Sequence, residues 1–359
     1  MNNGSAIARL TGVFTVCLLL LGYNVYGGLF KSTGGGIAAA DTLSLSSAAE
    51  STATEEKTES LGESTPESTP ESTAGNASSA ESRAEEQSVP TAASGTVKGK
   101  IISNYISPYK AASSYGNIYL KNSSGLNIDL KQLAESPLKF KIEKSEAPQV
   151  LIMHTHTTET YMTENTDYYT DAFSSRTRDK AKNMVSIGDI VATKLNAAGI
   201  KTLHDATEHD YPQYTGSYTR AAKTINGYLK KYPSIKVVLD LHRDAVSSGE
   251  SDKVKLVTEI NGKKAAQVML VMGSQSGKTT NFPNWQENLK LAVKLQQTLE
   301  TKFPTLARPI SLTSSNYNES LTTGSLLIEF GTDANTLEEA QYSADMVGQA
   351  LAELMNALT

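Results

Sequence analysis

Two histidines and a glutamate follow an apolar run near the middle of the chain. Residues 150–153 are Val-Leu-Ile-Met, and His154, His156 and Glu159 come directly after them. Such a run predicts a buried strand, which gives the residues at its carboxyl end a fixed position. Neutral imidazole and carboxylate are ligand types that zinc prefers. The spacing of His156 and Glu159 allows both side chains to coordinate one ion, so we expect a zinc site here.

Two further strand ends carry groups that could complete this site. His242 follows the apolar segment 237–241, and Glu329 ends another short apolar run. The carboxyl ends of parallel strands meet at one edge of a sheet, where functional groups gather. We therefore expect His156, Glu159 and His242 to bind zinc, with water as the fourth ligand. Glu329 is predicted to act as general base toward that water and then as general acid toward the leaving amine.

Several neighbouring residues have more than one interpretation. His154 is either a further metal ligand or a support for the ligands, because alternation along a strand points it away from His156. His204 and His209 are predicted to be polar groups of a loop, and the alternative for His209 and Asp210 is that they line a cleft. Three charged residues lie around His242 in the sequence: Asp240, Arg243 and Asp244. They either orient His242 or bind a carboxylate of the substrate. Of the three, Arg243 is predicted to be a catalytic residue.

Strand and helix patterns alternate along the body of the chain, which predicts an α/β fold with a mostly parallel sheet covered by helices on both faces. Strands are expected at 149–153, 200–204, 236–241, 253–259, 267–272 and 325–330, and helices at 182–198, 218–231, 285–302 and 337–357. Thr336 and Glu339 form a capping box at the start of the last helix, and Gly199 ends the first. Residues 97–145 predict a small β-containing extension, and residues 146–359 the catalytic domain.

The N-terminal quarter of the chain has a different composition. Residues 10–30 are apolar enough to cross a membrane as one helix, with residues 1–9 in the cytoplasm and the body outside. A cleaved signal peptide is the alternative, because residues 38–40 are alanines. Residues 31–96 are rich in Ser, Thr and Glu, which predicts a disordered tether. The net charge of −5 comes largely from this tether and gives no indication of a nucleic-acid partner, so none is expected.

Two conspicuous features are assigned no function. The segment 273–279 evokes a phosphate-binding loop, but three residues separate its glycines where the motif needs four. It is interpreted as an ordinary turn. Trp285, the only tryptophan, is assigned to packing at the start of a helix whose N-cap is predicted to be Asn284.

Several of these motifs together resemble the stage II sporulation protein P family. They are His154-Thr-His-Thr-Thr-Glu-Thr-Tyr161, Asp240-Leu-His-Arg-Asp-Ala245, Asn284-Trp-Gln-Glu-Asn-Leu289, Ser315-Asn-Tyr-Asn318, Leu327-Ile-Glu-Phe-Gly331 and Asn335-Thr-Leu-Glu-Glu339, within residues 115–359. That family is related to zinc-dependent N-acetylmuramoyl-L-alanine amidases, whose pattern falls on His156, His242 and Glu329. The amidases take a further glutamate from the start of the first helix. This chain has residues 182–184, Lys-Asn-Met, in that region, so Glu159 is the expected replacement.

The resemblance implies a membrane-anchored peptidoglycan hydrolase. Its expected substrate bond is the amide between N-acetylmuramic acid and the L-alanine of the stem peptide, with endopeptidase cleavage of cross-links as a further activity. It implies action at the sporulation septum and engulfing membrane, together with stage II sporulation proteins D and M. The alternatives are a noncatalytic peptidoglycan-binding scaffold and a zinc carboxypeptidase that trims stem peptides.

Overall fold

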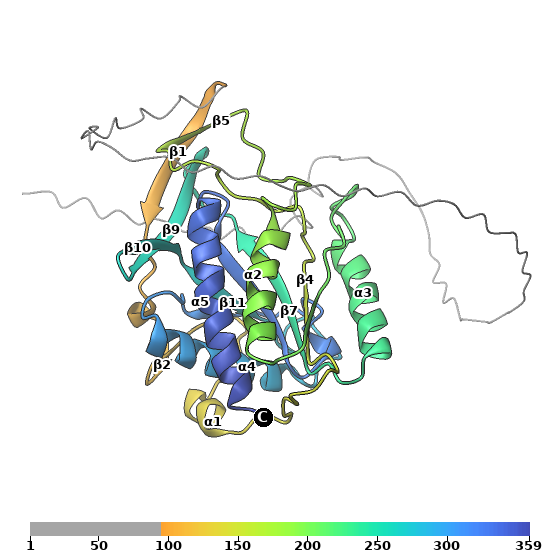
Figure 1. Ribbon diagram of the computed structural model, residues 1–359. Helices are drawn as coiled ribbons and strands as arrows, with labels where there is room; N and C mark the ends of the chain where they lie inside the picture. The colour runs from red at the N-terminus through yellow and green to blue at the C-terminus, as the bar shows by residue number, and fades with distance from the viewer. Residues whose placement is uncertain (1–94) are drawn as a thin grey trace, which may run out of the picture. The chain divides into compact units, whose positions relative to one another are not determined.

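The computed structural model describes residues 95–359, in which helices and strands alternate as predicted for an α/β protein (Figure 1). The predicted cytoplasmic N-terminus, the predicted anchor and all but the last two residues of the predicted tether lie outside the described residues. Within residues 95–359, the helices that form are too short or too polar to cross a membrane.

Eight strands make the main sheet. In spatial order they are β2 (Ser113–Tyr115), β3 (Ile118–Asn122), β12 (Ile310–Leu312), β11 (Val268–Met272), β13 (Ser325–Thr332), β7 (Val237–Asp244), β4 (Val150–Met153) and β6 (Thr202–His204). Neighbouring strands are parallel except at β2–β3 and β11–β13. The mostly parallel sheet that the sequence predicted is therefore present, and β13, β7 and β4 lie side by side with their carboxyl ends at one edge.

A second, smaller sheet packs beside the first. It contains β10 (Lys263–Ala266), β9 (Asp252–Ile260), β1 (Val97–Asn104) and β5 (Tyr168–Thr170) in that order, with β8 (Ser247–Ser248) paired to β9. The sequence did not predict this sheet. Residues 97–145 contribute β1 to the small sheet and β2 and β3 to the main one, so their strands pair with those of the rest of the body.

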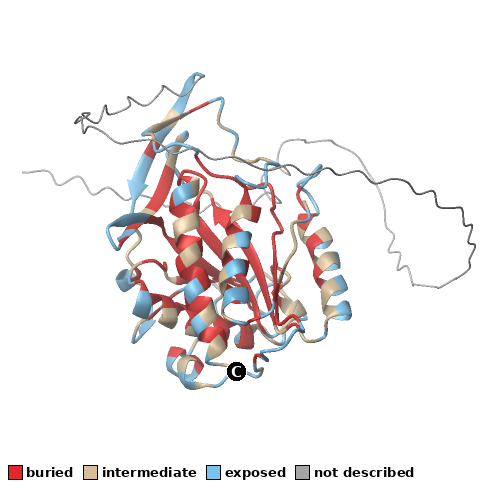
Figure 2. Cartoon of the chain, viewed as in Figure 1, coloured by how far each residue is buried: buried red, intermediate tan, exposed pale blue. Residues whose placement is uncertain are grey.

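Helices cover both faces of the main sheet, as Figure 1 shows. They are α1 (Leu130–Glu135), α2 (Met184–Ala197), α3 (Ser217–Lys231), α4 (Trp285–Lys302) and α5 (Leu337–Asn356), with 3-10 turns η2 (Pro108–Lys110) and η3 (Glu319–Leu321). Ile152 and Leu239 share the large core with α2, α4 and α5, whereas Leu151 and Val238 pack with α3 on the opposite face. Alternation along each strand sorts these side chains, and Figure 2 shows the buried residues lining the sheet between the helices.

The capping interactions predicted at the helix ends are present, with one exception. Thr336 Oγ1 accepts from the backbone N–H of Glu339 at 3.1 Å, and Glu339 Oε2 accepts from that of Thr336 at 3.1 Å, so the capping box is confirmed. Gly199, with φ of 80°, follows α2 in the left-handed conformation that favours glycine. Asn284 does precede α4, but its side chain donates to the carbonyl of Thr322 and does not cap the helix.

The region from 126 to 142 differs from a simple β pattern. Asp129 accepts from the backbone N–H of Gln132 at 2.9 Å and starts the short helix α1. Residues 138–142 form no strand within the described part of the chain, although Ile142 is buried and its N–H donates to Leu358 O at 3.0 Å. Residues 126–142 have only short stretches of alternating apolar and polar residues, which are too brief to determine a strand. Packing against distant parts of the chain therefore determines their conformation.

Candidate functional site

The predicted functional residues meet at the carboxyl-terminal ends of three adjacent strands, His242 within β7, Glu329 within β13, and His156 and Glu159 just after β4. His242 on β7 is the register partner of Glu329 on β13. His156 and Glu159 follow β4 in a turn where the N–H of Glu159 donates to His156 O at 3.2 Å. All four side chains are buried, with exposed fractions from 1% for Glu159 to 8% for Glu329. The fold thus gathers residues from three distant segments into one buried cluster.

The two histidines and Glu159 are in close proximity. The rings of His156 and His242 meet edge to face, with centroids 5.3 Å apart and planes at 89°. Oε2 of Glu159 lies 3.7 Å from Nδ1 of His242 and accepts from the backbone N–H of Arg243 at 3.2 Å. The H-x-x-E pair and His242 therefore share one small volume, as predicted.

Each residue of this cluster holds a buried polar atom that lacks a hydrogen-bond partner among residues 95–359. These atoms are His156 Nδ1, Glu159 Oε1, His242 Nε2 and Glu329 Oε2. An unpaired buried polar atom costs about 1–3 kcal/mol, so four in one place need an explanation. In the positions that they occupy, no three His, Cys, Asp or Glu side chains of the described residues are grouped closely enough to hold a metal ion.

The protonation of the cluster follows from burial and neighbouring charge. Burial first, and then the nearby charge of His242, lowers the pKa of His156 to about 2. Burial also acts to lower the pKa of His242, but the Asp240 carboxylate outweighs it and raises this pKa to about 9. Burial, followed by the charge of Asp244, raises the pKa of Glu329 to about 8. His156 is therefore neutral near pH 7, and Glu329 can exchange a proton at mildly alkaline pH.

Asp240 supports His242 from the same strand. Its Oδ1 lies 2.8 Å from His242 Nε2 but off the N–H direction, so the contact is an ion pair without a hydrogen bond. Thr155 fixes the carboxylate, with its N–H 2.8 Å from Oδ1 and its Oγ1 2.6 Å from Oδ2. Burial acts to raise the pKa of Asp240, yet His242 and Thr155 together hold it below its usual value. Of the two predicted roles of Asp240, the contacts match orientation of His242.

His154 points away from His156, as strand alternation predicted. Its Nδ1 lies 3.0 Å from Leu241 O, and its Nε2 lies 2.8 Å from Nε2 of His204. Burial first, and then His204, lowers the pKa of His154 to about 3. Both ring nitrogens of His154 are thus already engaged, which matches the supporting role better than that of a ligand.

Arg243 lies with its guanidinium among backbone carbonyls. Its Nε donates to Thr160 O at 3.0 Å and its Nη2 to Ser175 O at 2.7 Å, and the residue is buried. These bonds tie the turn that carries Glu159 to the segment that follows β5. In this structure Arg243 therefore positions the turn that carries Glu159, and the catalytic role inferred from the sequence stays a prediction.

The contacts of Arg243 make a stability prediction. Lysine has a single ammonium group and cannot reproduce two bonds made by a rigid fork. Arg243→Lys is expected to lower the free energy of unfolding by about 1.5–3 kcal/mol, the value of a hydrogen bond to a charged group, measured by urea denaturation. Arg178→Lys, at an exposed arginine paired with Glu208, should leave it essentially unchanged. An unchanged unfolding midpoint in Arg243→Lys together with a raised KM would instead show substrate contact.

Other polar residues near the site have structural partners. Asp244 pairs with Arg308, at 2.9 Å between Oδ2 and Nη1, and both residues are buried. Asp244 therefore belongs to an ion pair in the interior of the protein. His209 contacts His154 O at 2.8 Å and Thr224 Oγ1 at 2.9 Å, so it braces the turn after β4.

The sequence did not point to the residues that cover His156. Tyr214 stacks on the His156 ring at 4.5 Å between centroids, and its hydroxyl lies 3.1 Å from Nε2. Arg176 lies over the ring of Tyr214, 3.6 Å from Glu159 Oε1, and pairs with Asp210 at 2.5 Å. Arg176 also lines a cavity of 390 Å³. These residues lie in irregular segments, and a tyrosine-rich stretch at 211–218 is the one local signal of their presence.

The start of α2 supplies no replacement ligand. Asn183 caps the helix by accepting from the backbone N–H of Val185 at 3.0 Å, and Lys182 pairs with Asp179 on the surface. Besides Asp240 on the same strand, Glu159 is a carboxylate near His242, with Oε2 3.7 Å from Nδ1. This arrangement is the one expected when Glu159 takes the place of a helix-borne glutamate.

Comparison with solved structures gives weak likenesses to N-acetylmuramoyl-L-alanine amidases. AmiC2 of Nostoc punctiforme is 11% identical at a TM-score of 0.34, over 60% of this chain and 97% of that one. The amidase of Clostridium difficile 630 is 20% identical at 0.35, over 59% and 97%. The CwlD amidase of Clostridioides difficile, solved with the GerS lipoprotein, is 9% identical at 0.37, over 58% and 99%. TM-scores this low say nothing further about fold or activity.

Sequence comparison identifies the family. The curated stage II sporulation protein P of Bacillus subtilis (strain 168) is 28% identical over 219 residues, which are 57% of this chain and 50% of that protein. The chain thus matches about half the length of this curated relative. The family model "Stage II sporulation protein P (SpoIIP)" matches residues 30–352, most of the sequence. The chain belongs to the stage II sporulation protein P family.

Proposed function

We propose that this chain is a peptidoglycan hydrolase that cleaves the amide between N-acetylmuramic acid and the L-alanine of the stem peptide. One observation carries the proposal: four buried nitrogen and oxygen atoms of metal-ligand and acid–base type, none with a hydrogen-bond partner among residues 95–359, gather at the carboxyl-terminal ends of three adjacent strands. A fold that keeps such atoms unpaired loses stability, and a ligand that pairs with them restores it. Functional sites are where this loss is commonly retained.

We further propose that His156, His242 and Glu159 hold a zinc ion. Imidazole nitrogen and carboxylate oxygen are atom types that zinc binds. Neutral His156 can bind directly, whereas His242, whose pKa Asp240 raises to about 9, would release its proton on binding. The rings of His156 and His242, with centroids 5.3 Å apart, would both be close enough to hold one ion. When bound, zinc supplies Lewis acidity toward the scissile carbonyl and makes water acidic near neutral pH.

The remaining steps belong to side chains of this site. Glu329 takes a proton from the attacking water at its unpaired Oε2 and delivers it to the nitrogen of the leaving L-alanine. Asp240 orients His242, and Arg243 holds the turn that carries Glu159. Tyr214 and Arg176 cover His156 and exclude water from it, and the cavity beside Arg176 is a place for the stem peptide.

The setting of the reaction is part of the same proposal. Residues 10–30 anchor the chain in the membrane and residues 31–96 tether the catalytic body outside it, so that the body reaches peptidoglycan. The name of the family, stage II sporulation protein P, supports a role in sporulation. Septal thinning and engulfment, with stage II sporulation proteins D and M as partners and cross-link cleavage as a further activity, are the expected context.

Digestion of peptidoglycan tests the reaction. Purified full-length chain with added zinc should release stem peptides that begin with L-alanine, identified by mass spectrometry, because the proposed amide is the one that joins them to the glycan. Addition of a chelator should abolish the release, and addition of excess zinc should restore it. Release of single amino acids would show a carboxypeptidase instead, and an unchanged product profile would show a noncatalytic binding protein.

A further inference from the structure

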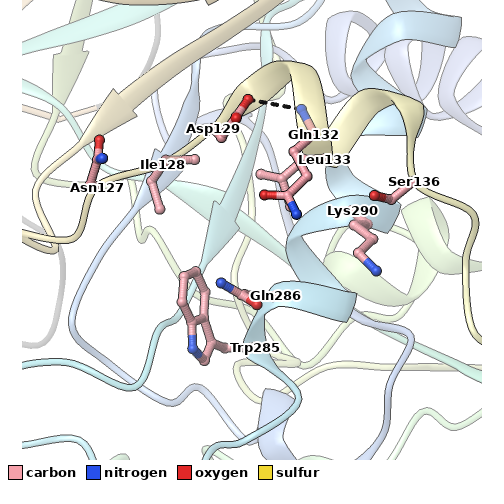
Figure 3. A pocket seen from close by; sticks show the side chains of 9 residues that line it. All are labelled: Asn127, Ile128, Asp129, Gln132, Leu133, Ser136, Trp285, Gln286 and Lys290. Atoms are coloured by element: carbon pink, nitrogen blue, oxygen red, sulfur yellow. Dashed lines mark hydrogen bonds between the residues drawn. The ribbon is translucent and has the colours of Figure 1, made fainter.

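A second hollow surrounds Trp285, at the end of the main sheet opposite to the proposed active site. Strand β11 runs antiparallel to β13, so its carboxyl end and the start of α4 lie where β13 begins. The hollow has a volume of 340 Å³ between α1 and the start of α4 (Figure 3). We call it the Trp285 groove and define it by the lining residues Asn127, Asp129, Gln132, Trp285, Gln286 and Lys290. Its volume is in the range of ordinary ligand sites.

The indole of Trp285 is available to a ligand. The side chain is only partly buried, packs against the core with one part and lines the groove with another. Among residues 95–359 its Nε1–H donates to no acceptor, so this donor is left to solvent or to a ligand. The packing role predicted from the sequence therefore accounts for only part of this side chain.

Three carboxamides border the same hollow without partners of their own. The side chains of Asn127, Gln132 and Gln286 make no hydrogen bond to any other described residue. Each offers donors and an acceptor. Figure 3 shows Asn127 and Gln132 on the side of α1, facing Gln286 and Trp285 across the opening. The groove is thus rich in neutral groups that both donate and accept.

The charges at the groove do not favour an ionic ligand. Asp129 Oδ1 accepts a hydrogen bond from the backbone N–H of Gln132 at 2.9 Å, and Lys290 is paired with Glu287 at 2.9 Å. One carboxylate and one neutralised ammonium group give no net attraction for a phosphate or a carboxylate. A neutral ligand with many hydroxyl or amide groups and an apolar face is the best chemical match.

We propose that the Trp285 groove binds the glycan of the cell wall, through N-acetylated sugar rings. One face of a pyranose ring presents C–H groups that rest on the electron-rich face of an indole. Its hydroxyl and N-acetyl groups then meet the carboxamides of Asn127, Gln132 and Gln286, which both donate and accept. The choice of wall glycan as the natural ligand rests on the proposed function, whereas sugar binding itself rests on the groove.

A groove at this place would keep the protein bound to the glycan strand. A glycan strand is long, so one protein can hold it at the Trp285 groove while the opposite end of the sheet acts on a stem peptide. Binding at one point raises the effective concentration of the other. This benefit is greatest for an enzyme that works on an insoluble substrate.

The chain contains its own reporter for this inference. Trp285 is the only tryptophan in all 359 residues, so fluorescence excited selectively in tryptophan, without the contribution of the 16 tyrosines, comes from this groove. Titration with the β-1,4-linked tetramer of N-acetylglucosamine should give a saturable change in emission. Gln286→Ala and Asn127→Ala change exposed residues and leave the core intact. Each should raise the apparent Kd about threefold to tenfold, since a lost hydrogen bond is worth about 0.5–1.5 kcal/mol.

Matched variants separate sugar binding from simpler explanations. Tyr105→Ala removes an exposed aromatic side chain from another hollow and should leave the apparent Kd unchanged. Trp285→Ala should lose co-sedimentation with insoluble chitin, and Trp285→Phe should keep part of it, with thermal melting to verify folding. An emission unaffected by the tetramer, or equal Kd values in wild type, Gln286→Ala and Asn127→Ala, would overturn the inference.

The outcome is independent of hydrolysis. Glu329→Gln should titrate with the tetramer as the wild type does, because Glu329 lies at the other end of the sheet. If stem peptides are released but the tetramer changes nothing, the groove inference alone fails. If the tetramer binds but no stem peptide is released, the proposed function fails and the groove inference stands.

Discussion

Glu329→Gln is expected to slow the release of stem peptides from peptidoglycan by about 10²- to 10⁴-fold, the usual contribution of a general acid–base group. Glutamine keeps the size of the side chain but cannot exchange the proton. Glu329 is suited to that exchange because burial, followed by the charge of Asp244, raises its pKa to about 8. The rate is measured by mass spectrometry of released peptides, and the metal content of the variant should equal that of the wild type.

Glu319→Gln is the matched control for this substitution. Glu319 is also a buried glutamate whose pKa is raised well above its usual value by burial, and it accepts from the backbone N–H of Gly273 at 2.8 Å. A glutamine oxygen can keep that bond, so the control should retain activity and fold. Full activity in Glu329→Gln, or equal losses in the two variants, would remove Glu329 from the acid–base role.

His156→Ala and His242→Ala are expected to reduce bound zinc from about one ion per chain to nearly none, because each removes one of three protein ligands. The measurement is metal analysis after dialysis. A second readout is the thermal stability of the chain, which zinc should raise in the wild type and leave unchanged in these variants. Both measurements are independent of catalysis.

His154→Ala is the contrasting variant in the same segment. His154 is fully buried and engaged by His204 and by Leu241 O, so its removal should destabilise the fold while most of the zinc remains bound. A support for the ligands costs about 10- to 100-fold in metal affinity when it is lost, less than a ligand does. Equal zinc loss in His154→Ala and His156→Ala would make His154 a ligand. An absence of zinc from the wild type would contradict the proposed metal site.

The order of strands and helices could be predicted because it depends on local periodicity. The runs at 150–153, 237–241 and 325–330 are long and apolar enough to mark buried strands, and β4, β7 and β13 form there. The capping box at Thr336 is equally local and is present. The second sheet and β12 were not predicted, since short strands are stabilised by partners far away in the sequence.

The sequence by itself determined which residues could do chemistry, because strand ends mark positions that a parallel sheet must bring to one edge. Only the tertiary structure decided which of those residues lie in the cluster and which support it from outside. It turns His154 toward His204, places Glu159 beside His242, and commits Arg243 to the carbonyls of Thr160 and Ser175. The cover formed by Tyr214 and Arg176, and the groove around Trp285, arise between irregular segments and helices that are distant in sequence. Such contacts leave no periodic pattern, so no local reading of residues could reveal them.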